Sequence, residues 1–209
     1  MSTDHVHSTA DHTPAADDET PGFYEILEIS IRELLTERGI IGAEEIRNQL
    51  ELLDSRSPAL GAKLVARAWT DEAFKKRLLA NGVSAAAELG ITIYDNTDFT
   101  VLENTEKVHH MVVCTLCSCY PRATLGLPPD WYKNKQYRSR AVREPRKVLA
   151  EFGTIIPEGR EICVNDSTAN LRYMVLPLRP KGTENYTIEQ LEALVTRDAM
   201  IGVKVLSID

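Results

Sequence analysis

The sequence predicts an α+β protein in which helices come first and strands begin after Gly90. Three observations support this class. Apolar residues recur at helical spacing over roughly the first ninety residues, segments of β-type composition follow, and the later part of the chain contains both patterns. The chain has 209 residues, which is enough for one or two compact domains with a hydrophobic core.

Residues 1–21 are predicted to form a disordered tail. Asp, Thr, Ser, Ala and His dominate this stretch, and no apolar period appears in it. The tail carries His5, His7 and His12, and spaced histidines can scavenge metal ions. We favour the simpler interpretation of a solvated tail.

The helical region begins at Phe23, where Tyr24, Leu27 and Ile31 start an apolar stripe. Gly39 provides a stop for this first helix. The apolar stripes of the region predict core or subunit contacts rather than a cofactor site. Further helices are predicted at about 43–54, at 58–69, from the N-cap Asp71 onward, and at 83–89.

Four strands follow, at about 99–102, 108–113, 161–164 and 171–176. The second strand runs straight into a cluster of cysteines, and a proline-rich loop comes after the cluster. That loop leads to a basic helix over about 139–152, which Pro145 must kink or restart. A last amphipathic helix is predicted over 187–197, with Thr187 as its N-cap.

Composition excludes several classes of function. The net charge of −7 argues against a nucleic-acid partner, so the basic stretch at 138–147 is interpreted as a solvated or interface face. No apolar run reaches the roughly 18 residues of a membrane span. The acidic, polar N-terminus does not resemble a secretory signal, and we therefore expect a cytoplasmic protein with no membrane partner.

Three of the four cysteines, Cys114, Cys117 and Cys119, lie within six residues. A disulfide scaffold would spread its cysteines along the chain, and no export signal is present. A metal or redox site is therefore the better prediction. Cys163 stands alone in a predicted strand, where we expect a small buried apolar residue.

The spacing Cys-x-x-Cys-x-Cys leaves a conventional site one ligand short. A tetrahedral zinc site needs four ligands, and an iron–sulfur cluster usually takes four cysteines. Cys163 could be the fourth ligand in either case, which keeps both alternatives open. His109 and His110 lie on the incoming strand, where alternation points them to opposite faces.

The unit Cys117-Ser118-Cys119 suggests another arrangement. Its two sulfurs flank the backbone amides of Ser118 and Cys119, and four such donors can lie in one plane around a metal. Cys114 can cap this plane and leave a sixth position open. Deprotonated amides and thiolates favour a small trivalent low-spin ion, cobalt(III) or iron(III), which would act as a Lewis acid. Thiolates held there are also open to oxidation to sulfenic or sulfinic acid.

The segment Val113–Pro121 resembles the metal-binding signature of the nitrile hydratase α subunit. The likeness covers residues from about 23 to 203 and includes several separate segments in the same order. These segments are Leu125–Lys133, Tyr137–Arg146, Arg172–Pro177 and Leu194–Asp198.

This resemblance implies a helical N-terminal arm followed by a layered α-β-β-α globular domain. The chain is then divided into a disordered tail at 1–21, a helical arm at 22–90 and a metal-binding α+β domain at 91–209. The arm of such a subunit wraps around a partner β-type subunit, whose arginines hydrogen-bond the oxidised sulfurs. A metal-delivery activator protein is a further expected partner.

The resemblance also implies the chemistry, which is hydration of a nitrile to an amide at a non-corrin metal. Thr115 and Tyr120 match the cobalt type, so cobalt(III) is favoured over iron(III). The nucleophile would be the sulfenate oxygen of Cys119 or a water that it activates, with Ser118 as the other catalytic position. The implied ligands are the Cys114 thiolate, the Cys117 sulfinate, the Cys119 sulfenate, and the amide nitrogens of Ser118 and Cys119.

Arg122 departs from the cobalt nitrile hydratases, which usually have Trp at this position. Here the sequence resembles the γ subunit of thiocyanate hydrolase, which handles an anion that a guanidinium would help to hold. Arg122 is therefore predicted to lie in the substrate pocket, and a thiocyanate hydrolase γ-like subunit is the alternative function. Two other interpretations are that Arg122 pairs with a carboxylate of a partner subunit, and that the chain carries or stores metal without catalysis.

Overall fold

The computed structural model describes residues 22–93, 97–116 and 119–208. The predicted tail, with its three histidines, lies outside the described residues. The chain divides into two compact units, residues 1–49 and 50–209. None of the helices in the described part of the chain is long and apolar enough to cross a membrane.

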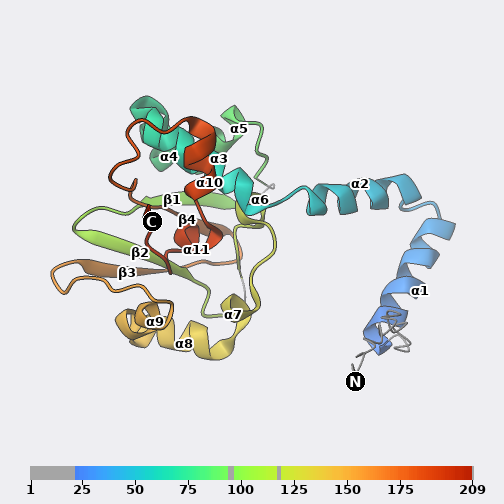
Figure 1. The fold of residues 1–209 in the computed structure, drawn as a ribbon. Helices are drawn as coiled ribbons and strands as arrows, with labels where there is room; N and C mark the ends of the chain where they lie inside the picture. The colour runs from blue at the N-terminus through green and yellow to red at the C-terminus, as the bar shows by residue number, and fades with distance from the viewer. Residues whose placement is uncertain (1–21, 94–96, 117–118, 209) are drawn as a thin grey trace, which may run out of the picture. The chain divides into compact units, whose positions relative to one another are not determined.

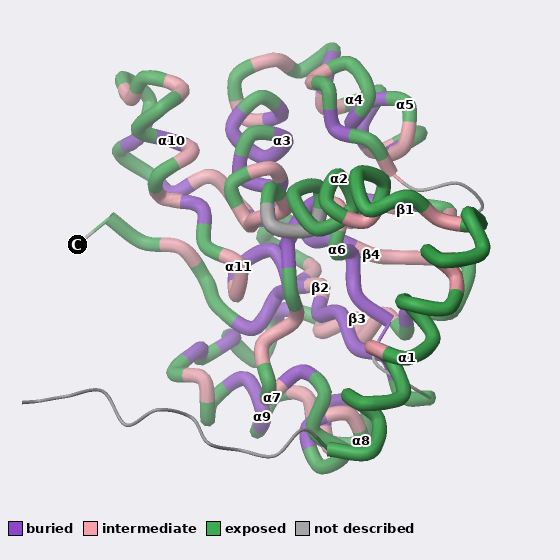
Figure 2. The backbone as a smooth tube through the Cα atoms, turned by 90° about the vertical axis from the view of Figure 1, so that its right-hand side faces the viewer, coloured by how far each residue is buried: buried purple, intermediate pink, exposed green. Residues whose placement is uncertain are grey.

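The first unit contains α1 (Phe23–Glu37) and most of α2 (Ala43–Asp54). The predicted stop at Gly39 is confirmed, since this glycine follows α1 with φ +63°. A glutamate side chain accepts a hydrogen bond from a glycine N–H before each helix, Glu25 from Gly22 at 3.3 Å and Glu45 from Gly42 at 2.7 Å. The apolar face of α1 is exposed, as the green tube of Figure 2 shows.

The second unit begins with three helices, α3 (Pro58–Thr70), α4 (Glu72–Ala80) and α5 (Gly82–Glu88). Asp71 is confirmed as an N-cap, because its carboxylate accepts a hydrogen bond from Phe74 N at 2.9 Å. These helices bury Leu64 and Leu78 in the same hydrophobic core as the strands. The helices after residue 50 are thus packed with the sheets, while the predicted division into tail, arm and metal-binding domain stays a prediction.

The strands form two parallel pairs. β1 (Asp98–Glu103) pairs with β4 (Leu171–Leu176), and β2 (Val108–Val113) pairs with β3 (Glu161–Asp166). β2 and β4 are neighbours, so the two pairs lie side by side. α4 and α5 pack on β1, and α9 packs on β3, which gives the predicted α-β-β-α layering (Figure 1). The predicted α+β class and the four predicted strands are confirmed.

The segment after the cysteines contains more helix than predicted. Two one-turn helices, α6 (Arg122–Leu125) and α7 (Asp130–Lys133), occupy the predicted proline-rich loop. A proline stands at the N-cap of each, where its missing N–H is not needed. Gly126 ends α6 with φ +69°, and a Cβ there would lie 2.8 Å from the carbonyl oxygen of Arg56.

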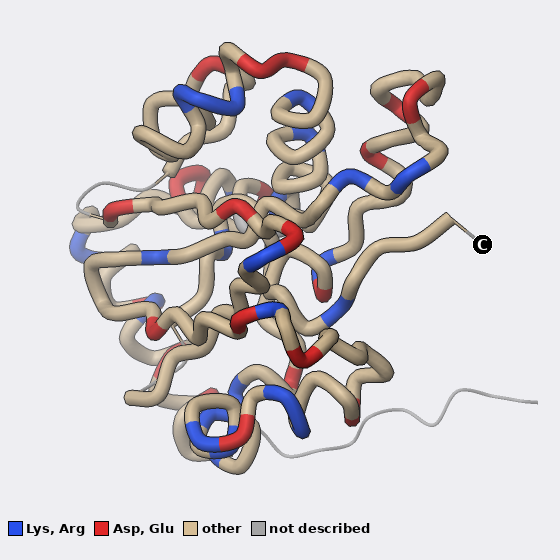
Figure 3. The backbone as a smooth tube through the Cα atoms, turned by 90° about the vertical axis from the view of Figure 1, so that its left-hand side faces the viewer, with Lys and Arg blue, Asp and Glu red and all other residues tan. Residues whose placement is uncertain are grey.

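The basic helix is two helices, α8 (Lys135–Arg143) and α9 (Pro145–Glu151), so the predicted restart at Pro145 is confirmed and the predicted start at 139 is too late. Several of its basic side chains make contacts within the chain. Arg140 pairs with two glutamates, Glu144 and Glu151, and Figure 3 shows basic and acidic positions side by side on this layer.

The last predicted helix is also two helices, α10 (Ile188–Leu194) and α11 (Arg197–Ile201). Thr187 is confirmed as the N-cap of α10. The prediction of one helix over 187–197 is wrong at its end because Val195 is extended and the Thr196 side chain caps α11 by accepting from Ala199 N at 3.3 Å.

Candidate metal centre

The cysteine loop, residues 114–119, follows β2 directly. Cys114 is fully buried at its start, and Cys119 is buried at its end. Cys117 and Ser118 lie outside the described residues, so the structure places only the two ends of the predicted ligand set. Leu116 is 89% exposed, whereas Cys114 and Cys119 are buried.

The start of the loop is anchored to the end of β3. Asp166 pairs in register with Val113, and its carboxylate accepts hydrogen bonds from the backbone N–H of Thr115, at 2.9 Å, and from the Thr115 hydroxyl. Ser167 N donates to Val113 O at 2.7 Å. A carboxylate that accepts two such bonds holds its partner in one conformation. The backbone at Thr115 is therefore fixed immediately after Cys114.

One buried tyrosine anchors the end of the loop, and a second buried tyrosine anchors the strand before it. The Tyr132 hydroxyl donates to the carbonyl oxygen of Cys119 at 2.9 Å, and the Tyr137 hydroxyl donates to Val112 O at 3.1 Å. Burial raises the pKa of both phenols far above the usual value, so both stay protonated donors. The Tyr120 ring packs edge-on against Tyr132, with centroids 4.9 Å apart.

Tyr120 itself is buried directly after Cys119. Its hydroxyl has no hydrogen-bond partner among the described residues, and burial raises the pKa of this phenol above its usual range. The neighbouring charges of Arg197, which lowers this pKa, and Asp198, which raises it, act on it from α11. The residue therefore stays neutral and closes the end of the loop with its ring.

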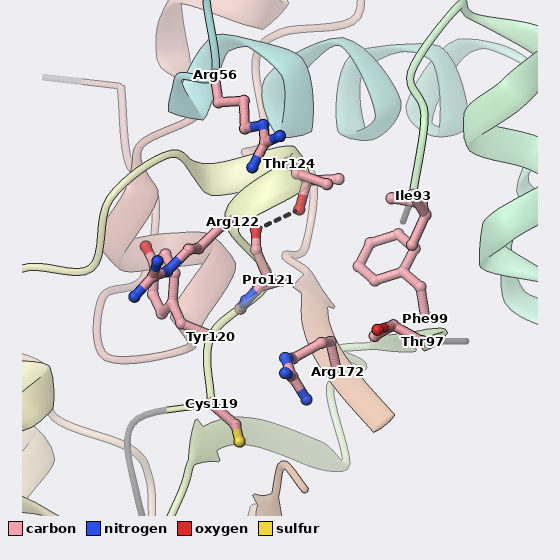
Figure 4. Close-up of a pocket in the computed structure, with 11 residues that line it drawn as sticks. Arg56, Ile93, Thr97, Phe99, Cys119, Tyr120, Pro121, Arg122, Thr124 and Arg172 are labelled. Carbon is pink, nitrogen blue, oxygen red and sulfur yellow. Dashed lines mark hydrogen bonds between the residues drawn. The ribbon is translucent and has the colours of Figure 1, made fainter. Parts of the chain in front are cut away.

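A cavity of about 390 Å³ opens beside Cys119. Figure 4 shows Cys119 and Arg56 at opposite ends of the view, Arg172 between them, and the side chain of Arg122 to one side, next to Tyr120. Ile93 and the ring of Phe99 supply an apolar wall. No Asp or Glu is present among the described residues that line the cavity.

The three arginines reach the cavity from separate segments. Arg56 lies between α2 and α3, Arg122 begins α6 two residues after Tyr120, and Arg172 is the second residue of β4. The pKa of Arg56 is lowered first by burial and then by the positive charge of Arg122. Arg172 donates to the backbone carbonyls of Thr168 and Leu171. The cavity is thus positively charged along its described wall.

His109 and His110, which precede the cysteine loop, make their hydrogen bonds elsewhere in the chain. His109 is buried, with Nε2 at 2.8 Å from Gly202 O and Nδ1 at 3.3 Å from the Asn104 side-chain amide. His110 lies on the opposite face, as predicted, with Nδ1 at 3.2 Å from the amide nitrogen of Asn165. Both imidazoles are therefore committed to contacts within the sheet layer.

The prediction that Cys163 is buried is wrong, because this residue is partly exposed. It lies on β3 in register with His110, and its thiol donates to Glu161 at 3.6 Å. Burial, followed by the nearby Glu161 charge, raises the pKa of this thiol, which disfavours a thiolate ligand. The described residues include no group of three or more His, Cys, Asp or Glu side chains arranged to hold a metal.

A metal held by the cysteine loop fits what is described of it. The polar anchors described for the loop bind its backbone and the Thr115 hydroxyl, and they fix the positions next to Cys114 and at Cys119. The burial of both sulfurs suits soft thiolate donors to a transition metal.

Sequence reasoning placed Cys114, Cys119 and Arg122 at this site, and the structure brings Cys119 and Arg122 into one cavity. It missed four residues that shape the site. Arg172 and Tyr132 fall inside segments that carry the family resemblance, which is a usable signal, whereas Arg56 and Asp166 carry none that separates them from other surface residues.

Comparison with known proteins gives one family. A family model described as "Nitrile hydratase, alpha chain" matches residues 23–204. The low-molecular-weight cobalt-containing nitrile hydratase subunit alpha of Rhodococcus rhodochrous is 53% identical, with 84% of this chain and 86% of that protein covered. The thiocyanate hydrolase subunit gamma of Thiobacillus thioparus is 44% identical, with 87% and 79% covered.

Solved structures agree with this fold. An Fe-type nitrile hydratase double mutant from Comamonas testosteroni Ni1 superposes with a TM-score of 0.81 at 44% identity. A recombinant thiocyanate hydrolase described as comprising partially modified cobalt centres superposes with a TM-score of 0.83 at 42% identity. Each match covers 88% of this chain and 90% of the other.

Proposed function

This chain belongs to the nitrile hydratase α-chain family. From that membership we propose that its cysteine loop binds a low-spin cobalt(III) ion, at which a nitrile is hydrated to its amide. The observation that carries the proposal is the placement of Cys119. This residue ends the loop and also lines the 390 Å³ cavity, so a ligand sulfur and a space for a small substrate coincide.

The proposed donors are the sulfurs of Cys114, Cys117 and Cys119 and the backbone amide nitrogens of Ser118 and Cys119. Thiolates and deprotonated amides together favour a small trivalent ion, and a cobalt ion bound there would supply Lewis acidity to polarise the nitrile. The name of the Rhodococcus relative, cobalt-containing, supports cobalt over iron. Iron(III) stays the alternative metal, since the similar solved structures include Fe-type nitrile hydratase.

The chain's own residues would then position the reacting groups. We propose that Cys117 is a sulfinate and Cys119 a sulfenate, as in the family, and that the Cys119 oxygen or a water that it activates attacks the nitrile carbon, with Ser118 as the other catalytic position. Tyr132 holds the Cys119 carbonyl, and its buried ring packs edge-on against Tyr120.

The proposed assembly is a heteromer with a β-type subunit. The exposed apolar residues of α1, which include Phe23 at 74% and Tyr24 at 81% exposure, support a partner surface there. We further propose that partner arginines complete the site, that a metal-delivery activator protein loads it, and that the complex is cytoplasmic.

The test is turnover by the complex of this chain with its β-type subunit, produced with cobalt. We expect a neutral nitrile to give its amide, and we expect Cys119→Ala to abolish turnover while the complex still assembles. Unchanged turnover by that variant would contradict the proposed role of Cys119.

The second candidate function is that of a thiocyanate hydrolase γ-like subunit. Arg122 favours it, because this cation lines the same cavity as Cys119 and a guanidinium suits a small anion. The gamma subunit from Thiobacillus is also among the similar chains. Parallel assays with thiocyanate and with a neutral nitrile separate the two functions, and turnover of neither by the metal-loaded complex would favour a metal carrier.

A further inference from the structure

The cavity beside Cys119, which we name the cationic pocket, is lined by Arg56, Arg122, Arg172 and Cys119 together with an apolar wall. Three arginines from separate segments line this one space, and none of its described lining residues is acidic. In a protein with a net charge of −7, this local reversal of sign is informative. Such a concentration of positive charge in a concave space attracts anions.

Along the pocket, the cation Arg56 is separated from the sulfur of Cys119. Figure 4 places Arg56 at the end of the view opposite Cys119, with its side chain directed toward Thr124, while the side chain of Arg122 lies beside Tyr120. The charge of Arg122 helps to lower the pKa of Arg56, which indicates that these two cations act on each other. An anion bound at the Arg56 end would be attracted by both charges, and it would lie away from Cys119.

Size and lining favour an organic anion over a triatomic one. A cavity of about 390 Å³ is within the range of ordinary small-molecule sites, which is larger than thiocyanate requires. Ile93 and Phe99 line it with apolar surface between the charged groups. A short hydrocarbon chain fits beside these residues better than water or a second ion does.

We propose that the substrate is a nitrile that also carries a carboxylate. The carboxylate binds Arg56, where the charge of Arg122 also attracts it, the chain lies along Ile93 and Phe99, and the nitrile points toward Cys119. Guanidinium groups suit this role because they bind a carboxylate through two parallel hydrogen bonds. This inference rests on the proposed function and adds the substrate class.

The experiment uses the cobalt-loaded complex with its β-type subunit and two probes of similar shape, 4-cyanobutanoate and its methyl ester. The ester lacks the negative charge and keeps the nitrile. We expect kcat/KM to favour the carboxylate by about tenfold or more, since a hydrogen bond to a charged group contributes on the order of one to two such factors. Raising the salt concentration should reduce this preference.

The variant Arg56→Gln removes one charge from the pocket, and Lys63→Gln is the matched control because Lys63 is an exposed cation on α3 that does not line the pocket. We expect Arg56→Gln to lower the carboxylate-to-ester ratio by about 10- to 100-fold, and Lys63→Gln to leave it unchanged. A binding measurement accompanies these assays, in which calorimetry follows 4-cyanobutanoate binding to the metal-free complex.

The outcomes are distinguishable. If the ester and the carboxylate are hydrated equally and Arg56→Gln changes neither, the inference is overturned while the proposed function stands. If Arg56→Gln instead weakens subunit assembly without changing the ratio, the arginine pairs with a partner carboxylate and the inference is again overturned. If neither nitrile is hydrated, the proposed function fails, and calorimetric binding that Arg56→Gln removes would still support the anion site, whereas no binding would overturn it.

Discussion

The hydroxyl of Tyr132 should control the geometry of the cysteine loop. It donates to Cys119 O at 2.9 Å from a fully buried position. Tyr132→Phe removes only this oxygen and retains the edge-on ring contacts with Tyr120 and Trp131, at 4.9 Å and 6.0 Å between centroids. The carbonyl of Cys119 then loses its donor in a buried site, at a cost of about 1–3 kcal/mol in the free energy of unfolding.

Tyr137→Phe is the matched control. It removes a similar hydroxyl from the same aromatic cluster, but that hydroxyl bonds Val112 O in β2 at 3.1 Å, upstream of the loop. We expect both variants to be less stable in urea titrations of the complex. Only Tyr132→Phe should also shift the sulfur-to-cobalt absorption band and raise KM relative to kcat, because only it frees the end of the loop.

Equal spectra for the two variants and the parent complex would contradict this role of the Tyr132 hydroxyl. The role would also be refuted if Tyr137→Phe shifted the absorption band as much as Tyr132→Phe does. In either case the hydroxyl of Tyr132 would be a packing contact without influence on Cys119.

Two further predictions concern Gly202 and His109, which contact each other through a hydrogen bond. Gly202→Ala should destabilise the protein by about 3 kcal/mol in thermal unfolding, because φ is +87° and a Cβ would clash with the carbonyl of His110. The control Gly153→Ala, at φ +77° with no atom within 4 Å of the added Cβ, should cost about 1 kcal/mol. Equal losses of stability in the two variants would contradict this prediction. Burial, and next the Arg160 and His110 charges, lower the pKa of His109, while its hydrogen bond to Gly202 raises it. Protonation therefore favours the unfolded chain, so stability should be full above pH about 6.5 and decline below it, and a His109→Gln variant that kept the same decline would refute that assignment.

Local signals in the sequence predicted most helix starts. Asp71 and Thr187 cap their helices because a short polar side chain before an apolar stripe satisfies the first free N–H groups. The strands were also predictable, since β-branched and apolar runs begin after Gly90. These elements depend on near neighbours in the chain, which is why a single sequence reveals them.

Features that depend on packing were not predictable. The one-turn helices α6 and α7 form where prolines stand at N-cap positions and the ring of Tyr132 is buried, and no periodicity marks so short an element. The break at Val195 depends on capping by Thr196, which competes with helix continuation. Cys163 is partly exposed because β3 pairs with β2 alone among the described strands and none of its residues is buried, which the sequence of one strand does not reveal.

The candidate site divides in the same way. The spacing of the cysteines predicted a metal site, and Arg122 stood out because it differs from the family pattern. Arg56 and Arg172 come from distant segments and join Arg122 only in the folded chain. Asp166 could not be identified without knowing that β3 ends opposite Val113.

The most direct test of the metal centre is intact mass with metal analysis of this chain, produced with its β-type subunit in cobalt-containing medium. We predict one cobalt per chain and added mass equal to three oxygen atoms on the peptide that spans Cys114–Cys119, two on Cys117 and one on Cys119. Stoichiometric zinc with unmodified cysteines would contradict the account.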